Sequence, residues 1–276
     1  MKLVTILLVV FAVIFILWIL AIRCRCSNPL MDELKKYRYA HRGFHEKPYV
    51  AENSITAFRH AVDHGFGSEL DVHLLADGNL AVIHDSSLMR TCGLDIRIED
   101  MTTEQIRKCR LEESYDSIPT LADVLNVYKN AHLPLIIELK VENGNFEDLC
   151  TELYRQLQSY SGLYCIESFD PRAVAWFRRN APEVARGQLA TNFIKGTHSG
   201  QGRLIDFVLT NLLMNIIAVP DFIAYEYKYR RNLSLMLARD LWSVDEANWT
   251  IRKKKTLLKS ESLGNIPIFE RFDPEK

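Results

Sequence analysis

The sequence lacks the features that mark fibrous, disordered and nucleic-acid-binding proteins. Among 276 residues it has only 12 Gly and 9 Pro, with no internal repeat and no low-complexity segment, which excludes a fibre or a disordered chain. The formal net charge is -1 and no Lys/Arg cluster dominates the body of the chain, so we expect no nucleic-acid partner. The basic run 252–255 is expected to be a solvated helix face. With 48% hydrophobic residues, the chain can build one large or two small domains.

Cysteine is also scarce. The six cysteines, at positions 24, 26, 92, 109, 150 and 165, form neither a metal-binding spacing nor an obvious disulfide framework. This usage is compatible with a reducing compartment.

One long apolar run stands at the amino-terminal end of the sequence. Leu3 to Ile22 carries no charge, and its twenty residues match the roughly 20 needed to cross the ~30 Å hydrocarbon layer of a membrane. A cleaved signal peptide is the alternative, but its apolar region has only ~7 to 15 residues and ends in small residues. Here the run ends in Trp18-Ile-Leu-Ala-Ile-Arg23. We therefore predict a single-pass anchor within residues 1–26, touching the membrane through residues 3–22.

The charges that flank this span predict its orientation. One positive residue, Lys2, precedes it, and the cluster after it contains Arg23, Arg25, Lys35, Lys36 and Arg38. Because positive flanks stay in the cytoplasm, we expect the rest of the chain on the cytoplasmic side. Residues 27–36 are expected to be a linker, and residues 37–276 the folded domain.

From residue 37 onward, short apolar runs alternate with helical patterns. The expected parallel strands lie at His41, Glu69, Glu138, Tyr164, Gln188, Ile223, Leu241 and Ile268, and the run 80–83 follows the second strand too closely for a helical crossover. Eight such strands predict an α/β fold, a (β/α)8 TIM barrel, with an extra β-hairpin after strand two. An open doubly wound sheet is the alternative, but no glycine-rich phosphate-binding turn follows the first strand.

Three segments carry more detailed expectations. We expect one apolar helix over 204–217, a strand over 240–243, and a helix from the capping signature 243–246 to about Leu258. The helix 204–217 has more apolar residues than one buried face requires, so either it is well buried or its outer face, with Leu212 and Leu213, touches the lipid interface.

Charged side chains gather at the carboxyl ends of the predicted strands. Residues i and i+2 of a strand face the same way, so Glu69 lies beside Asp71, and Glu138 beside Lys140. Three carboxylates at one barrel mouth would repel one another without a cation between them, and an all-oxygen ligand set predicts Mg²⁺ or Ca²⁺. Structural salt bridges are the alternative.

Two histidines and an arginine flank these acids. His41 and His84 can exchange protons near neutral pH, whereas the other six histidines have no motif around them. Arg42 can bind a phosphate with its two-pronged guanidinium group.

In order, these motifs resemble the glycerophosphodiester phosphodiesterase family. The resemblance covers residues 37–276 and rests on His41-Arg-Gly43, Ala51-Glu-Asn-Ser54, Glu69-Leu-Asp-Val72, Asp77-Gly78, His84-Asp85 and Glu138-Leu-Lys140. Departures from the family pattern fall at Ala51, Leu75 and 243–245, outside the proposed ligands.

The resemblance implies a role for each motif residue. It implies a divalent metal ion on Glu69, Asp71 and Glu138, an acid–base pair of His41 and His84, and phosphate contacts from Arg42 and Lys140. It also implies supporting roles for Glu52, which orients the metal and phosphate ligands, and for Asn53. Trp242, expected at the barrel mouth, either lines the substrate pocket or packs structurally.

The implied reaction is metal-dependent hydrolysis of a glycerophosphodiester to an alcohol and glycerol 3-phosphate. Either water or the neighbouring glycerol hydroxyl is the nucleophile. Lysophospholipids are further candidate substrates, as for a lysophospholipase D. A phosphodiesterase like phosphoinositide phospholipase C and a catalytically silent lipid-headgroup binder remain the alternatives.

Overall fold

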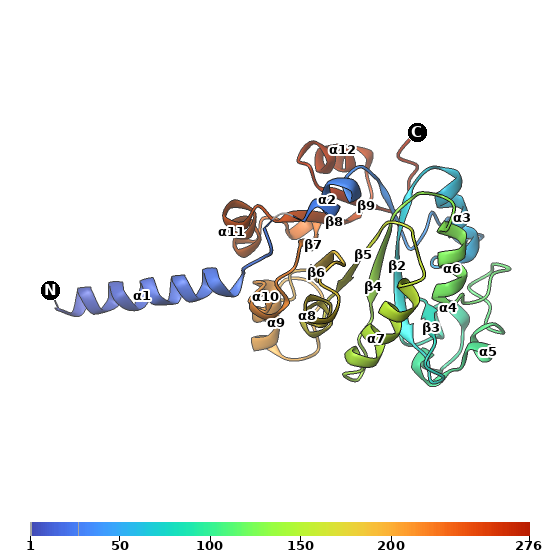
Figure 1. Ribbon diagram of the computed structural model, residues 1–276, viewed down its shortest axis with the longest axis horizontal. Helices are drawn as coiled ribbons and strands as arrows, with labels where there is room; N and C mark the ends of the chain where they lie inside the picture. Colours follow the sequence, from blue (N-terminus) through green and yellow to red (C-terminus); the bar gives the residue numbers. More distant parts are fainter. Residues whose placement is uncertain (1, 27) are drawn as a thin grey trace.

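The computed structural model describes residues 2–26 and 28–276 and contains a closed parallel barrel with one projecting helix (Figure 1). Met1 and residue 27, the first residue of the expected linker, lie outside the described residues. The strands of the barrel are β1 (Tyr39–His41), β2 (Gly67–Leu74), β4 (Leu135–Leu139), β5 (Tyr164–Ser168), β6 (Arg186–Ala190), β7 (Phe222–Glu226), β8 (Asp245–Ile251) and β9 (Ile266–Phe269). Within the described residues these eight strands pair in parallel, and β1 closes the barrel by pairing with both β2 and β9.

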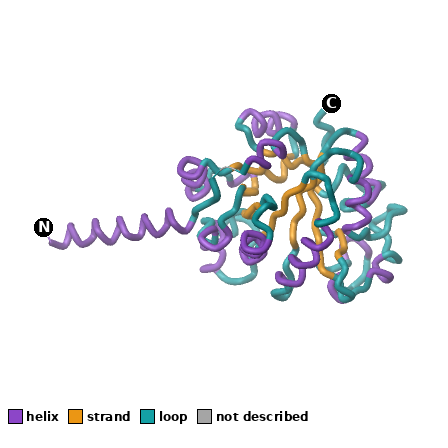
Figure 2. Tube along the Cα trace, in the orientation of Figure 1, coloured by secondary structure: helices purple, strands orange, loops and turns teal. Residues whose placement is uncertain are grey.

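Helices pack around the ring of strands, and one long helix at the amino-terminal end of the chain projects away from it (Figure 2). They are α1 (Lys2–Ala21), α2 (Pro29–Leu34), α3 (Ile55–Asp63), α4 (Met89–Cys92), α5 (Thr103–Ile106), α6 (Leu121–Tyr128), α7 (Phe146–Leu157), α8 (Pro171–Asn180), α9 (Arg203–Thr210), α10 (Asn215–Ala218), α11 (Leu233–Trp242) and α12 (Lys254–Ser262), with short 3₁₀ turns at Ile98–Asp100 and Tyr227–Tyr229. The predicted hairpin is confirmed, because β3 (Leu80–Val82) runs antiparallel to β2.

Local signals explain where several helices begin. Thr120 and Asp123 form a capping box at the start of α6, and the Asp170 side chain caps α8, whose first residue is Pro171. Both satisfy amide groups that the first helical turn leaves without partners.

Alternation along the strands separates two kinds of interior. On β4, Leu135, Ile137 and Leu139 pack outward against the helices, whereas Ile136 and Glu138 alternate with them and face the barrel axis. The barrel interior is apolar near the amino-terminal ends of the strands, and near their carboxyl-terminal ends it carries the charged side chains. The strand-end charges are therefore held at the carboxyl-terminal mouth of a packed barrel.

The expected linker is largely a helix. Residues 29–34 form α2, capped by Asn28, and buried Met31 and Leu34 pack against Tyr39 and Phe222 inside the barrel. The linker assignment was wrong for these residues because two apolar side chains, one turn apart, close the amino-terminal end of the barrel.

The expected strand over 240–243 was also wrong. These residues end α11, where Ser243 adopts a left-handed conformation with φ 50°, and strand β8 starts at Asp245. The capping signature misled the prediction because Glu246 does not cap a helix. It is buried and binds Arg230 and Arg239, both at 2.8 Å from its Oε2 atom.

The expected single helix over 204–217 is divided into α9 and α10. The chain turns between them at Leu212, whose φ of 58° is left-handed and whose side chain is only 2% exposed. Leu212 packs in the same apolar cluster as Ile22 and Tyr225. Of the two alternatives for this segment, burial is therefore correct for Leu212, and contact of Leu212 with lipid is excluded.

Candidate active site

Three carboxylates meet at the carboxyl-terminal mouth of the barrel. Glu69 and Asp71 project inward from β2 and Glu138 from the neighbouring β4, where Asp71 is in register with Glu138. All three side chains are buried, and one oxygen from each lies within 4.8 Å of the others.

Two cations and an amide hold these acids. The Lys140 Nζ atom lies 2.9 Å from Asp71 Oδ1 and 2.6 Å from Glu138 Oε1. Arg42 Nε lies 3.5 Å from Asp71 Oδ2, and the Asn53 side chain donates a hydrogen bond of 2.8 Å to the same oxygen. The backbone N–H of Arg42 donates to Glu69 Oε2 at 3.1 Å.

The nearby cations do not fully stabilise the charged forms of the three carboxylates, so a further positive charge would be favourable here. Burial and the like charges of Asp71 and Glu138 raise the pKa of Glu69 well above its usual range, and burial raises the pKa of Glu138 to about 7. Burial acts in the same direction on Asp71, but its pKa is held well below normal by Lys140, His84 and Arg42. Three crowded oxygen ligands of this kind fit a hard divalent cation, which would favour their charged forms.

His41 and His84 are each held by a carboxylate. His41 Nδ1 lies 2.8 Å from Glu270 Oε2, and its Nε2 lies 3.9 Å from Glu69. His84 Nδ1 lies 2.6 Å from Asp85 Oδ1. A carboxylate that accepts the Nδ1 proton leaves Nε2 as the free proton acceptor of each ring.

The surroundings favour neutral rings. Burial lowers the pKa of His41, with Arg42 contributing, while Glu270 opposes the shift. Burial lowers the pKa of His84 to about 4, and the positive charges of Lys140 and Arg42 act in the same direction. Both imidazoles can therefore accept a proton at neutral pH.

Glu52 organises the cations beside the site. Its Oε1 atom accepts from Arg42 at 2.7 Å and from Arg90 at 2.6 Å, while its Oε2 lies 2.9 Å from Lys47. Burial opposes ionisation, but these cations hold the pKa of Glu52 well below its usual range. Glu52 is therefore an anion that fixes the Arg42 side chain.

Glycine is required at position 43, the last residue of the His-Arg-Gly motif, for a steric reason. Gly43 has φ +79°, and a Cβ atom there would lie 2.9 Å from the backbone of Ala57 in α3. Only glycine lets β1 turn over α3 while Arg42 keeps its place between Glu52 and Asp71.

Comparison with known proteins agrees with this geometry. The model of the glycerophosphoryl diester phosphodiesterase family matches residues 41–264. The chain belongs to this family. A glycerophosphodiester phosphodiesterase of Bacillus altitudinis is 31% identical over 166 residues, which cover 56% of this chain and 67% of that protein. Human glycerophosphodiester phosphodiesterase 1 is 25% identical, with 72% of this chain and 67% of that protein covered. The rat protein named lysophospholipase D GDPD1 is 28% identical over 46% of this chain and 45% of its own length.

Solved structures share the fold. An Oleispira antarctica phosphodiesterase, solved with the product sn-glycerol-3-phosphate, superposes with a TM-score of 0.69 at 20% identity, covering 85% of this chain and 92% of that one. A glycerophosphodiester phosphodiesterase from Thermotoga maritima gives a TM-score of 0.63 at 21% identity, with 84% and 93% covered. By family the protein is a glycerophosphodiester phosphodiesterase, and its TIM barrel is confirmed.

An aromatic groove of about 850 Å³ leads away from the phosphodiesterase site. His84 lines it together with Phe169, Phe193 and Trp249. The ring centroid of Phe169 lies 5.9 Å from that of Phe193 and 5.8 Å from that of Trp249. Glu226, which accepts from the Thr191 hydroxyl at 2.5 Å, is an acidic group in this groove.

Trp242 lies elsewhere. It ends α11 and packs in the outer apolar cluster with Trp18 and Val244. Because α11 runs back along the barrel, its last residue lies toward the amino-terminal ends of the strands, and the expected position at the mouth was wrong. Trp249 on β8 occupies the mouth instead.

Sequence reasoning also missed Glu270 and the contact of Asp85 with His84. Glu270 directly follows the last strand, so the rule that located the other strand-end acids would have found it. Glu167, buried on β5 opposite Glu138, obeys the same rule, and burial raises its pKa well above normal.

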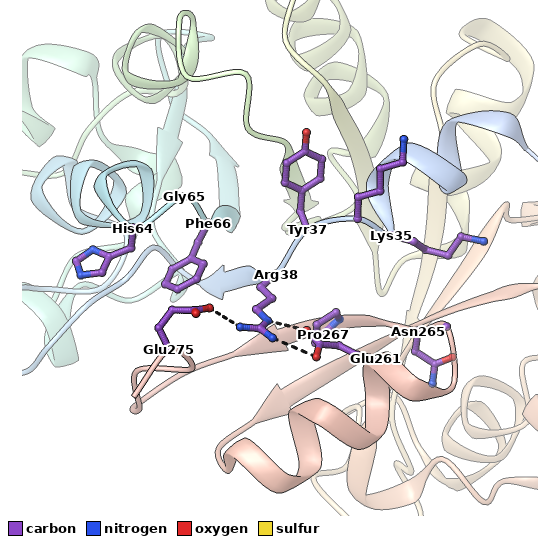
Figure 3. A pocket seen from close by; sticks show the side chains of 12 residues that line it. Lys35, Tyr37, Arg38, His64, Gly65, Phe66, Glu261, Asn265, Pro267 and Glu275 are labelled. Atoms are coloured by element: carbon purple, nitrogen blue, oxygen red, sulfur yellow. Dashed lines mark hydrogen bonds and ion pairs between the residues drawn. The ribbon is translucent and has the colours of Figure 1, made fainter.

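A second cavity, of about 580 Å³, opens at the other end of the barrel (Figure 3). Its Arg38 is paired with Glu261 at 2.6 Å and also with Glu275, and Lys35 is paired with Asp245 at 2.8 Å. These cations are neutralised by structural partners, and neither His41 nor His84 is among the residues that line the cavity.

Proposed function

We propose that this protein hydrolyses glycerophosphodiesters in a metal-dependent reaction, releasing an alcohol and glycerol 3-phosphate. The observation that carries the proposal is the convergence of Glu69, Asp71 and Glu138 within 4.8 Å, between two histidines that are each oriented by a carboxylate. When bound there, Mg²⁺ or Ca²⁺ would act as a Lewis acid toward the phosphoryl oxygens.

Different side chains bind the phosphate and transfer the protons. Arg42 and Lys140 attract the phosphate and stabilise the negative charge that grows on it. The neutral ring of one of His41 and His84 removes the proton of the nucleophile, and the other, in its protonated form, gives a proton to the departing alcohol oxygen. Water can serve as the nucleophile and gives glycerol 3-phosphate directly. If the adjacent glycerol hydroxyl attacks instead, the alcohol leaves and a cyclic phosphate forms, which water then opens to glycerol 3-phosphate. Glu270 and Asp85 keep the Nε2 atoms turned toward the substrate.

Lysophospholipids are a second candidate substrate class. The aromatic groove beside His84 supports this choice, because Phe169, Phe193 and Trp249 offer an apolar surface for an alkyl chain. The rat relative is named a lysophospholipase D. A catalytically silent headgroup binder is less well supported, because none of the proposed catalytic or ligand side chains is missing.

We further propose that α1 is a single-pass membrane anchor with the barrel on the cytoplasmic side. The helix is long and apolar enough to cross a membrane, and its charge flanks favour this orientation. Trp18 Nε1 donates to Ser234 Oγ at 3.0 Å and Ile22 is buried against the barrel. A segment that contributes core contacts supports an uncleaved anchor better than a removable signal peptide. The free cysteines agree with a reducing side.

The test uses the full chain purified in detergent with glycerophosphocholine as substrate. We expect choline and glycerol 3-phosphate, loss of turnover in EDTA, and recovery with Mg²⁺ or Ca²⁺. Lysophosphatidylcholine is assayed in parallel for lysophosphatidic acid. Turnover unchanged by EDTA would refute the metal requirement. Release of phosphocholine would mean that the other ester bond is cleaved, as in a phospholipase C.

A further inference from the structure

Helix α9 has an unusual distribution of side chains. Its two buried residues are polar, Asp206 and Thr210. Two of its apolar residues, Leu204 and Phe207, are 75% and 50% exposed, and the other three are partly buried. A helix on the surface of a soluble barrel normally has the opposite arrangement. This outward apolar face therefore suits a non-aqueous neighbour.

The buried polar residues of α9 hold the loop beside the aromatic groove. Asp206 accepts from the backbone and hydroxyl of Ser199 at 2.9 and 2.5 Å, and lies 2.9 Å from His198 Nδ1. Thr210 accepts from the backbone N–H of Phe193 at 2.9 Å. His198 and Phe193 line the groove, so whatever contacts the outer face of α9 also lies near the opening of the groove.

The junction between α1 and the barrel is packed. Besides the bond from Trp18 to Ser234, the backbone N–H of Arg25 donates to Pro220 at 2.9 Å, and the Arg25 side chain lies 3.4 Å from buried Asp221. Figure 1 shows α1 leaving the barrel on the side that carries α9, α10 and α11. The anchor therefore sets which face of the barrel meets the bilayer.

The length of α1 brings that face into the bilayer surface. Trp18, Ile19 and Ile22 pack in a cluster with barrel residues, whereas residues 3–17 of α1 are all exposed. At ~1.5 Å per residue these span only about 22 Å, less than the ~30 Å hydrocarbon layer. The stretch 18–22 must then lie in the membrane as well, together with the barrel surface packed around it. The shortfall of about 8 Å lies within the ~5–10 Å to which interfacial helices bury their apolar faces.

Apolar and basic residues surround the junction in the pattern that an interface requires. The exposed apolar side chains of α9, α10 and α11, which we call the apolar rim, are Leu204, Phe207, Ile216, Ile217, Leu233, Met236 and Leu241. Arg23 donates to the carbonyl of Ile216 at 3.2 Å and Arg178 to that of Ile217 at 3.0 Å. Guanidinium groups at the edge of an apolar surface favour anionic headgroups.

We propose that the apolar rim is inserted into the lipid interface of the membrane that α1 crosses, which brings the aromatic groove to the bilayer surface. The inference rests on the proposed anchor. It adds a second contact with the bilayer, made by the barrel itself.

The experiment reconstitutes the full chain into vesicles of phosphatidylcholine with 20% phosphatidylserine. Exposed Cys26 and partly exposed Cys92 are first changed to Ser. A single cysteine that carries a fluorescent label then replaces Leu204 or Phe207. The matched control carries the label at position 263, where Leu263 at the end of α12 is 50% exposed. Nitroxide lipids should quench the labels at 204 and 207 by roughly twofold or more, as expected at interfacial depth, and leave 263 unchanged.

Two outcomes separate the inference from the proposed anchor. Protein released by alkaline carbonate would refute the anchor itself. Protein that resists carbonate but has unquenched labels at 204 and 207 would overturn only the insertion of the rim. In a second variant, Leu204→Asp with Phe207→Asp, turnover of soluble glycerophosphocholine in detergent should be unchanged, which shows that the barrel is folded. Turnover of lysophosphatidylcholine in vesicles should fall about tenfold, and equal rates for variant and parent would contradict the inference.

Discussion

At the residue scale, the mouth of the barrel concentrates more negative charge than its two nearest cations neutralise. Lys140 and Arg42 contact Asp71, whereas Glu69 receives a hydrogen bond from a backbone amide only and has a raised pKa. Among the three proposed metal ligands, Glu69 is therefore the acid whose charge costs most without a metal ion, and the one whose replacement separates catalysis from folding.

For Glu69→Gln we expect a loss of turnover of about 10³-fold or more, since an essential ligand oxygen is removed. The melting temperature in EDTA should not fall, because a neutral amide relieves the repulsion among the acids. Added Mg²⁺ should raise the melting temperature of the parent more than that of the variant. A variant that retains parental turnover would refute the metal role of Glu69.

The histidines give the second prediction. His41→Ala and His84→Ala should each reduce kcat by about 10² to 10⁴, the usual contribution of a positioned acid or base. The pH profile of the parent should be bell-shaped. A flat profile between about pH 5 and 9, or a His84 variant as fast as the parent, would exclude this acid–base role.

The carboxylate partner of His41 provides a graded comparison. Glu270→Gln should cost roughly 10 to 100-fold, less than loss of the ring. Because Glu270 raises the pKa of His41, its loss should also shift the corresponding limb of the pH profile to lower pH. A purely structural role for Glu270 would leave the profile in place.

His45 gives a prediction about stability and pH. Its buried ring nitrogens have no hydrogen-bond partner among the described residues, and burial lowers its pKa to about 4 despite nearby Glu52 and Glu270. The folded state keeps the ring neutral, whereas the unfolded chain binds a proton near pH 6.5. The stability that depends on the neutral ring is therefore complete above about pH 6.5 and is lost as the pH falls toward 4.

Urea denaturation of His45→Phe and of the parent, each at several pH values, measures the contribution of the neutral His45 ring to the free energy of unfolding. The parent should lose up to about 3 kcal/mol relative to the variant between pH 7 and pH 4. Parallel pH curves would contradict the assignment of this loss to His45.

At the element scale, the short helix α2 closes the amino-terminal end of the barrel. Its Met31 and Leu34 are fully buried with Tyr39 and Phe222. This apolar plug separates the charged mouth from solvent at the other end of the barrel axis.

Met31→Ala should reduce the free energy of unfolding by about 2–5 kcal/mol, as for other buried large-to-small changes. The control is Glu33→Ala on the exposed side of the same helix, which should change it by less than about 0.5 kcal/mol. Urea denaturation of the full chain in detergent provides the measurement. Equal midpoints for the two variants would mean that α2 behaves as a linker.

At the scale of the whole molecule, the end of α1 is packed against the barrel. If α1 is the membrane anchor that we propose, the side of the membrane on which the barrel lies follows from the orientation of α1. In sealed vesicles with the cytoplasmic face outward, we expect added protease to remove an epitope placed after Lys276. The charge asymmetry across the span is the physical reason. Protection of the epitope until detergent opens the vesicles would reverse the proposed topology.

The sequence by itself determined the barrel, the hairpin and the acidic and histidine residues of the mouth. These depend on short-range regularities: alternation along strands places Glu69 beside Asp71, and strand ends share one face of a parallel barrel. The single apolar run of twenty residues belongs to the same class of local signal.

Only the tertiary structure decided which apolar or acidic residues face which partner. Glu246 was expected to cap a helix, yet it neutralises two arginines from distant positions. Leu212 is buried and Leu204 exposed although both belong to one apolar segment. Trp249, not Trp242, lines the mouth. Such choices depend on contacts between residues far apart in the chain, and their energies are not encoded in the local spacing that sequence patterns record.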